Sequence, residues 1–258
     1  MITISKVCTL LGSALLLSGC YAQSQYSSGA DYLAAQPTSV SAPANQANMM
    51  SVDERVALAA NVEPNLRFPG HFGLARLVNG QLTAIPEAEA ALWMEVVDRH
   101  PDFGTFTPIS PLVAHLAASH VGLSQSGNRK SRAIESVRIG AARQHVDTVL
   151  IYEAGARSDK GNTLLAIADL TIIGGAFLPT RHIETAGKAS AILVDVRNGY
   201  PYGHASAVVD LSRFHSSWGS DRKTRDMERE AILEVVGDLV IEVEDMLLDL
   251  RTKAKAHT

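Results

Sequence analysis

One stretch, DTVLIYEA at residues 147–154, constrains the fold more than any other part of the chain. Its apolar and β-branched residues run on without the polar alternation of a strand that has one face in water. A strand of this kind is buried on both faces and lies in the middle of a sheet. Because a helical pattern over 132–145 leads directly into it, the stretch predicts a layered domain in which helices cover a sheet.

Two Asn-Gly dipeptides predict hairpins in this sheet, because Asn-Gly suits both positive-φ positions of a type I′ turn. Each dipeptide lies between two apolar strand patterns, and a single strand followed by an irregular loop is the alternative for the first. The first hairpin joins 72–78 to 81–85 through Asn79-Gly80, and the second joins 189–197 to 200–209 through Asn198-Gly199.

Helical periodicity accounts for much of the remaining sequence. Pro86 begins a helix with acids in its first turn, as the helix dipole favours. Its predicted buried stripe consists of Ala91, Leu92, Glu95, Val96 and Arg99, with Trp93 and Met94 at the margins. A short strand over 102–110 and a helix from 111 follow, and the last element is one long helix over about 220–255. The order of elements predicts the α+β class, as a single layered domain with a mixed β-sheet flanked by helices.

The N-terminus has the parts of a secretory signal, with Lys6 before the apolar run Val7–Leu17 and small residues before Cys20. The sequence Leu-Ser-Gly-Cys at 17–20 resembles the bacterial lipobox. That resemblance implies a signal peptide over 1–19, cleavage between Gly19 and Cys20, and a diacylglyceryl group on the Cys20 sulfur. An ordinary signal peptide with a chance cysteine is the alternative.

Lipidation removes thiol chemistry from the mature protein. Cys8 lies in the predicted leader and Cys20 carries the lipid, so neither a disulfide nor a catalytic or metal-binding cysteine is expected. Three acyl chains such as palmitate anchor a protein in effect permanently. In bacterial lipoproteins Asp after the cysteine causes retention in the inner membrane, so Tyr21 favours the outer membrane, facing the periplasm.

A polar stretch of low complexity follows the cysteine. Residues 21–50 are rich in Ser, Ala, Gln, Asn and Pro and hold one charged residue, Asp31. This composition predicts a flexible tether within 20–60, ahead of a periplasmic domain over 61–258. A poorly packed first helix around 52–60 is the alternative for its last part.

No residue set identifies a reaction or a cofactor. The formal charge of −4 and the absence of a basic stripe argue against nucleic-acid binding. His115 and His120 are five residues apart, so on a helix they do not bind one metal as an i, i+4 pair does. No metal ligand is therefore predicted. His182, His204 and His215 are the residues that an enzyme would use, with surface or hydrogen-bonded histidines as the alternative.

Two stretches resemble a known family. TIIGGAFLPT at 171–180 and ASAILVDVRNG at 189–199 are similar to segments of the bacterial rhombotarget lipoproteins, and the order of elements over about 66–210 is similar too. At the level of fold, the chain also resembles periplasmic lipoproteins of the curli-export and synthase-activator type. Both resemblances imply a non-enzymatic envelope protein and transfer no catalytic residue.

The expected function is therefore protein–protein contact at a membrane, in an accessory, assembly or regulatory role. The partners are one or more unidentified envelope proteins or further copies of this chain. One candidate interaction loop consists of Gly174, Gly175, Phe177, Leu178 and Pro179, where apolar side chains adjoin a Gly-Gly pair; core packing is the alternative. The other candidate contact surface is the long C-terminal helix. The competing function is a hydrolase acting on an envelope polymer.

Overall fold

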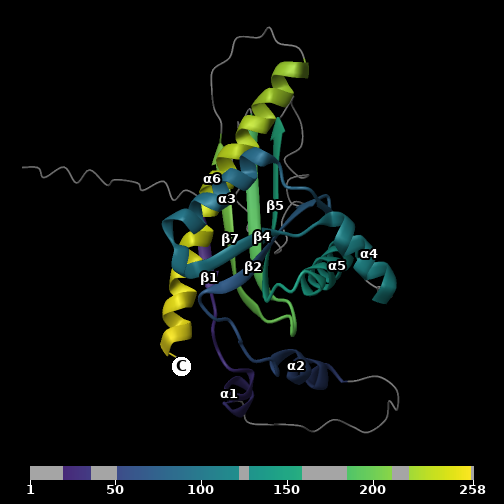
Figure 1. The fold of residues 1–258 in the computed structure, drawn as a ribbon, viewed down its shortest axis with the longest axis vertical. Helices are drawn as coiled ribbons and strands as arrows, with labels where there is room; N and C mark the ends of the chain where they lie inside the picture. Colours follow the sequence, from purple (N-terminus) through teal and green to yellow (C-terminus); the bar gives the residue numbers. More distant parts are fainter. Residues whose placement is uncertain (1–19, 36–50, 122–127, 159–184, 211–220, 257–258) are drawn as a thin grey trace, which may run out of the picture.

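A computed structural model describes residues 20–35, 51–121, 128–158, 185–210 and 221–256 (Figure 1). Its elements in chain order are β1 (Tyr21–Ser24), α1 (Gly29–Ala34), α2 (Val52–Ala60), β2 (Gly70–Val78), β3 (Gln81–Thr83), α3 (Glu87–Arg99), the 3-10 helix η1 (Pro101–Phe103), β4 (Gly104–Pro108), α4 (Pro111–Val121), α5 (Arg129–Arg143), β5 (Thr148–Ser158), β6 (Thr185–Asp195), β7 (Pro201–Asp210) and α6 (Asp221–Ala256). No helix in these ranges is long and apolar enough to cross a membrane.

The strands form one mixed sheet of seven strands in the described part of the chain, in the order β1-β7-β6-β5-β2-β3, with β4 also paired to β2. β2 pairs with β4 and β5 in parallel, and the other pairs are antiparallel. Helices α6 and α3 cover one face, and α4 and α5 lie on the other (Figure 1). The predicted α+β class, with a mixed sheet and a long C-terminal helix, is confirmed.

β5 occupies the predicted central position, because its alternate residues enter two separate cores. Leu150 and Tyr152 belong to the core under α6, whereas Val149 and Ile151 belong to the core under α5. All four side chains are fully buried. The period of two residues along a strand explains why one continuous apolar run fills both layers.

The two predicted hairpins differ in their turns. Asn79 and Gly80 have φ values of 52° and 70°, as a type I′ turn requires. In the second hairpin only Gly199 has positive φ, at 80°, and its N–H donates to Asp195 O at 3.1 Å. The Asp195 side chain accepts from the N–H groups of Arg197 and Asn198, at 2.8 and 3.1 Å. This carboxylate stabilises a longer turn than the Asn-Gly dipeptide predicts.

The buried face of α3 is rotated from the predicted stripe. Trp93, predicted at its margin, is fully buried, and Glu89 is only 4% exposed. Glu89 is tolerated there because Arg76 Nε on β2 donates to its carboxylate at 2.7 Å. Apolar periodicity alone cannot predict a stripe that includes a paired acid.

The segment after Cys20 differs from the flexible tether expected over 21–50. Tyr21–Ser24 forms β1 and pairs with β7, and Gly29–Ala34 forms α1. The helix around 52–60, which was the alternative to the tether there, is present as α2, with no buried residue. Residues 36–50 lie outside the described ranges. β1 is too short for its alternating pattern to be recognised among Ser, Gln and Ala residues.

Candidate functional site

Cys20, the predicted lipidation residue, lies immediately before β1 at the edge of the sheet. It is partly exposed and packs against the core under α6. Burial raises the pKa of its thiol, a backbone hydrogen bond with Val208 lowers it, and the carboxylates of Asp238 and Glu242 raise it further. The groups that act on this thiol come from the end of β7 and from the middle of α6.

β1 is held on both sides. Its four residues pair in antiparallel register with β7, from Tyr21 opposite Ser206 to Ser24 opposite Gly203. On the other side, Lys253 Nζ on α6 donates to Ser24 O at 3.0 Å and to Ser24 Oγ at 2.8 Å. The Ser24 hydroxyl also donates to Asp249. The strand is therefore fixed to both the sheet and the long helix.

Gly203 is the point where β1, β7 and α6 meet. A Cβ at this position would lie 2.4 Å from Gln23 O and 2.6 Å from Met246 Sδ, closer than van der Waals contact permits. Glycine is required here because backbone and side chain approach from two elements at once.

Two tyrosines at the start of β7 hold the chain that follows β1. Tyr200 Oη accepts from Ser27 N at 2.9 Å and donates to Ser27 O at 3.0 Å. The fully buried Tyr202 hydroxyl donates to Asp195 at 2.9 Å and accepts from Asn65 N at 2.9 Å. Burial is the main reason that the pKa of Tyr202 is well above its ordinary value. The Tyr202 phenol is therefore a neutral structural group that donates one hydrogen bond and accepts another.

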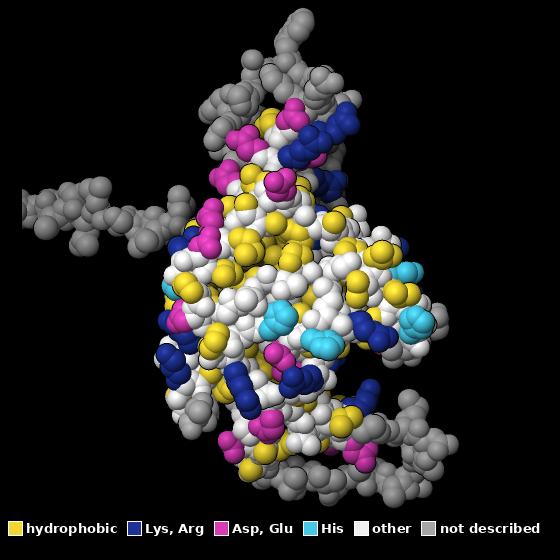
Figure 2. Space-filling view, viewed as in Figure 1, with side chains coloured by type: hydrophobic (Ala, Val, Ile, Leu, Met, Phe, Trp, Pro, Cys, Tyr) yellow, Lys and Arg dark blue, Asp and Glu magenta, His cyan; other side chains and the backbone are white. Residues whose placement is uncertain are grey.

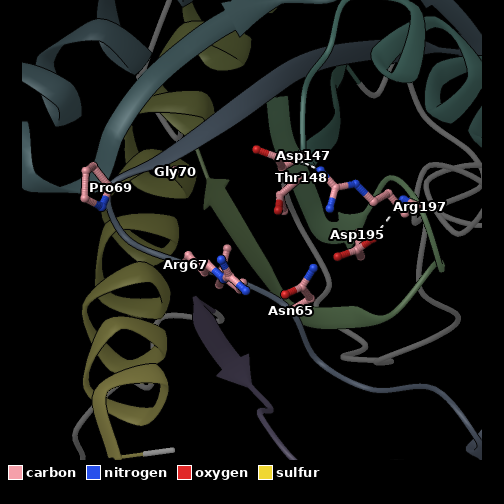
Figure 3. A pocket seen from close by; sticks show the side chains of 9 residues that line it. Asn65, Arg67, Pro69, Gly70, Asp147, Thr148, Asp195 and Arg197 are labelled. Atoms are coloured by element: carbon pink, nitrogen blue, oxygen red, sulfur yellow. Dashed lines mark hydrogen bonds and ion pairs between the residues drawn. The ribbon is translucent and has the colours of Figure 1, made fainter. Parts of the chain in front are cut away.

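A pocket of about 260 Å³ opens beside these tyrosines (Figure 3). It is lined by Asn65, Leu66, Arg67, Pro69, Gly70, Asp147, Thr148, Asp195 and Arg197. Arg197 pairs with Asp147 at 2.6 Å, and Asp195 accepts from two backbone N–H groups and one phenol. Both carboxylates are therefore held by hydrogen bonds to donors of the chain itself.

Of the three histidines that an enzyme would use, the structure describes only His204. His204 is partly exposed and packs edge-on against Tyr21 at a ring distance of 5.5 Å. His115 and His120 are exposed on α4, where Figure 2 shows histidine side chains at the surface. His182 and His215 lie outside the described residues, as does the candidate interaction loop at 174–179. No group of three His, Cys, Asp or Glu in the described ranges is arranged to hold a metal ion.

Sequence reasoning missed a buried polar cluster beneath α3. Glu89 accepts from Arg76 Nε and from Tyr152 Oη, at 2.7 and 2.8 Å. On the opposite face of the sheet, Glu153 is 1% exposed and lies 3.3 Å from Lys130 Nζ. Burial raises the pKa of Glu153, and Lys130 opposes the rise. The only signal in the sequence is the pair Tyr152 and Glu153, which carry polar groups within the central strand pattern.

No protein-family model matches the chain, and no curated protein matches it. Two solved structures of dodecameric PelC from Paraburkholderia phytofirmans are similar to this chain, each with a TM-score of 0.33. The first is 14% identical and covers 71% of this chain and 93% of PelC. The second is 13% identical and covers 69% of this chain and 88% of PelC. The C-terminal domain of LpoB from Salmonella enterica is similar at 16% identity, with a TM-score of 0.27, over 55% of this chain and 84% of that domain. At these values no residue role or function is transferred.

Proposed function

We propose that this protein is a bacterial envelope lipoprotein, anchored through a covalent lipid on Cys20, that works without catalysis through contacts with other proteins. The observation that carries the proposal is Leu-Ser-Gly-Cys at 17–20, placed directly after an apolar signal-like run. The proposed location is the outer membrane, facing the periplasm, because the residue after the cysteine is Tyr21 and not the Asp that causes retention in the inner membrane. It also includes membership of the rhombotarget lipoproteins, for which the quoted motifs and their order are the support.

The role in protein contacts is supported by apolar side chains that the fold leaves exposed. Leu112 and Leu116, one helical turn apart on α4, are 77% and 57% exposed. On α6 the stripe from Ala231 to Leu250 is buried against the sheet, and Leu233 is exposed. Exposed apolar residues grouped on a helix mark contact surfaces.

Lipidation is tested by replacing Cys20 with Ser in the full chain and following the protein in bacterial membrane fractions. We expect the wild-type protein in membranes with an acyl label on Cys20, and Cys20→Ser to lose the label and the membrane association. Cys8→Ser is the matched control, because it changes the other cysteine within the predicted leader and should retain both. A Cys20→Ser protein that remained acylated would contradict the proposal.

The role in protein contacts is tested by crosslinking in intact cells, followed by purification of the lipidated protein. Recovery of specific envelope proteins, or of crosslinked copies of this chain, is expected. Recovery of neither would contradict the proposed role in protein contacts.

A further inference from the structure

We propose that the anchored domain lies directly on the bilayer, through an anchor face formed around Cys20 by Tyr21, His204, Val208, Asp238, Ile241 and Glu242. The inference rests on the proposed lipidation of Cys20. It goes further, because it assigns the surface of the domain that meets the membrane and the side that faces away.

The lipid attachment site lies directly beside the folded domain. A flexible tether of thirty residues would reach roughly 30 Å from the membrane. In the structure, Tyr21 already pairs with Ser206 of β7, one residue after the cysteine that would carry the lipid. One residue spans about 3.4 Å, so the acylated sulfur and the sheet edge lie at the same depth.

Several independent contacts hold β1 in this arrangement. β1 pairs with β7 and is bonded to α6 through Lys253. The next residues continue the attachment, since Gln25 N donates to Tyr202 O at 2.7 Å and Ser27 bonds to the Tyr200 hydroxyl. Releasing β1 to gain reach would break these contacts together.

The chemistry of the anchor face suits a bilayer surface. Tyr21, Val208 and Ile241 have exposed fractions of 40%, 37% and 56%. Tyr21 follows Cys20, the Val208 backbone is hydrogen-bonded to Cys20, and Ile241 is next to Glu242 on α6. Tyrosine is enriched at membrane interfaces because its ring is apolar and its hydroxyl is polar. Asp238 and Glu242 lie close enough to the Cys20 sulfur to raise its pKa. Their carboxylates suit the ammonium group of a phosphatidylethanolamine surface.

The opposite end of the sheet provides the reference surface. α4 packs on α5, and α5 contacts β2, β3 and β5. β1 lies at one end of the strand order and β3 at the other, so α4 is remote from the anchor face (Figure 1). The exposed Leu112 on α4 should therefore point away from the bilayer.

The test uses the full chain in its lipidated form, reconstituted into vesicles of phosphatidylethanolamine and phosphatidylglycerol that contain a head-group nitroxide lipid. Single cysteines at Val208, Ile241 or Leu112 take a fluorophore, because the mature protein offers no other free thiol. We expect fluorescence at 208 and 241 to be quenched several-fold more than at 112. Equal quenching at the three positions in vesicle-bound protein would overturn the inference and leave the lipid anchor standing.

A matched variant carries ten Gly and Ser residues inserted directly after Cys20. It keeps β1 and adds a flexible reach of roughly 17 Å. Quenching at 208 and 241 should fall to the level seen at 112, while the circular dichroism spectrum stays unchanged. Unchanged strong quenching in this variant would overturn the inference. Protein recovered without lipid and absent from vesicles would overturn the proposed function as well.

Discussion

Lys253 and Ser24, from opposite ends of the chain, form a hydrogen-bonded pair in which the Lys253 ammonium donates to the Ser24 backbone oxygen at 3.0 Å and to its hydroxyl at 2.8 Å. Lys253 also pairs with Asp249 at 2.8 Å. The three residues connect the first strand to the last helix. The hydrogen bond from Lys253, followed by that from Ser24, lowers the pKa of Asp249.

Lys253→Met should raise the pKa of Asp249 toward its ordinary value of 3.8. The bond stabilises the fold above that value and is lost as pH falls through the lower folded pKa. Both side chains are substantially exposed, so the loss of stability at pH 7 should stay within about 1 kcal/mol. A carboxyl NMR titration measures the pKa, with the exposed Lys255→Met as control. An unchanged Asp249 titration would contradict the pairing.

Gly203→Ala should displace β1, because the new methyl group would clash with Gln23 O and Met246 Sδ. We expect a loss of about 1–3 kcal/mol of unfolding free energy, as for other overpacked sites. Amide hydrogen exchange over 21–24 should become faster. Gly237→Ala is the control, because a Cβ there meets nothing within 4 Å and the helix should gain about 0.5–1 kcal/mol. Unchanged exchange in β1 would argue against its close packing.

Glu89→Ala should be among the most damaging single substitutions. It leaves the Arg76 guanidinium, whose side chain is 12% exposed, without its carboxylate, and removes the acceptor of the Tyr152 hydroxyl. Loss of one partner of a buried ion pair costs about 3–5 kcal/mol. Urea unfolding measures the effect, and the exposed Glu87→Ala in the same helical turn is the control. Equal effects of the two substitutions would show that the buried pair is unimportant.

Glu244→Gln should weaken the contact between α3 and α6 in a pH-dependent way. Hydrogen bonds, first from Arg99 and then from His100, lower the pKa of Glu244 from its ordinary 4.5. A lowered folded pKa stabilises the protein above 4.5, and this contribution is lost as pH falls further. We expect the variant to lose about 1 kcal/mol at pH 7 and progressively less as pH falls below 4.5. Stability curves of wild type, Glu244→Gln and the exposed Glu234→Gln at several pH values test this.

The sequence predicted elements whose pattern is long and apolar. β5 was placed correctly because no polar residue interrupts Val149–Tyr152, and α6 because its stripe repeats along the whole helix. The polar contacts could not be predicted, because nothing in the local sequence shows that Glu89 faces Arg76 or that Asp195 stabilises the second hairpin turn. The pairing of Glu244 on α6 with Arg99 and His100 could not be predicted for the same reason.

The candidate site was predicted only at Cys20, where a motif of adjacent residues carries the signal. The docking of β1 depends on Tyr200, Tyr202 and Lys253, which are far from it in sequence. Composition describes residues 21–28 as a tether because their own side chains bury little surface. These residues are ordered because they pair with the edge of β7 and bond to Tyr200 and Tyr202. A local sequence pattern does not contain that information.

The contact between α1 and α2 has a practical consequence. A Cβ on Gly29 would lie 2.0 Å from Ala60 O, and the Glu63 side chain accepts from Ala30 N at 2.9 Å. The segments before and after 36–50 are therefore in direct contact with each other. The length of the intervening stretch therefore sets no distance between anchor and domain. An epitope tag or protease site inserted there should leave the architecture intact, and homologues are free to differ in length at this point.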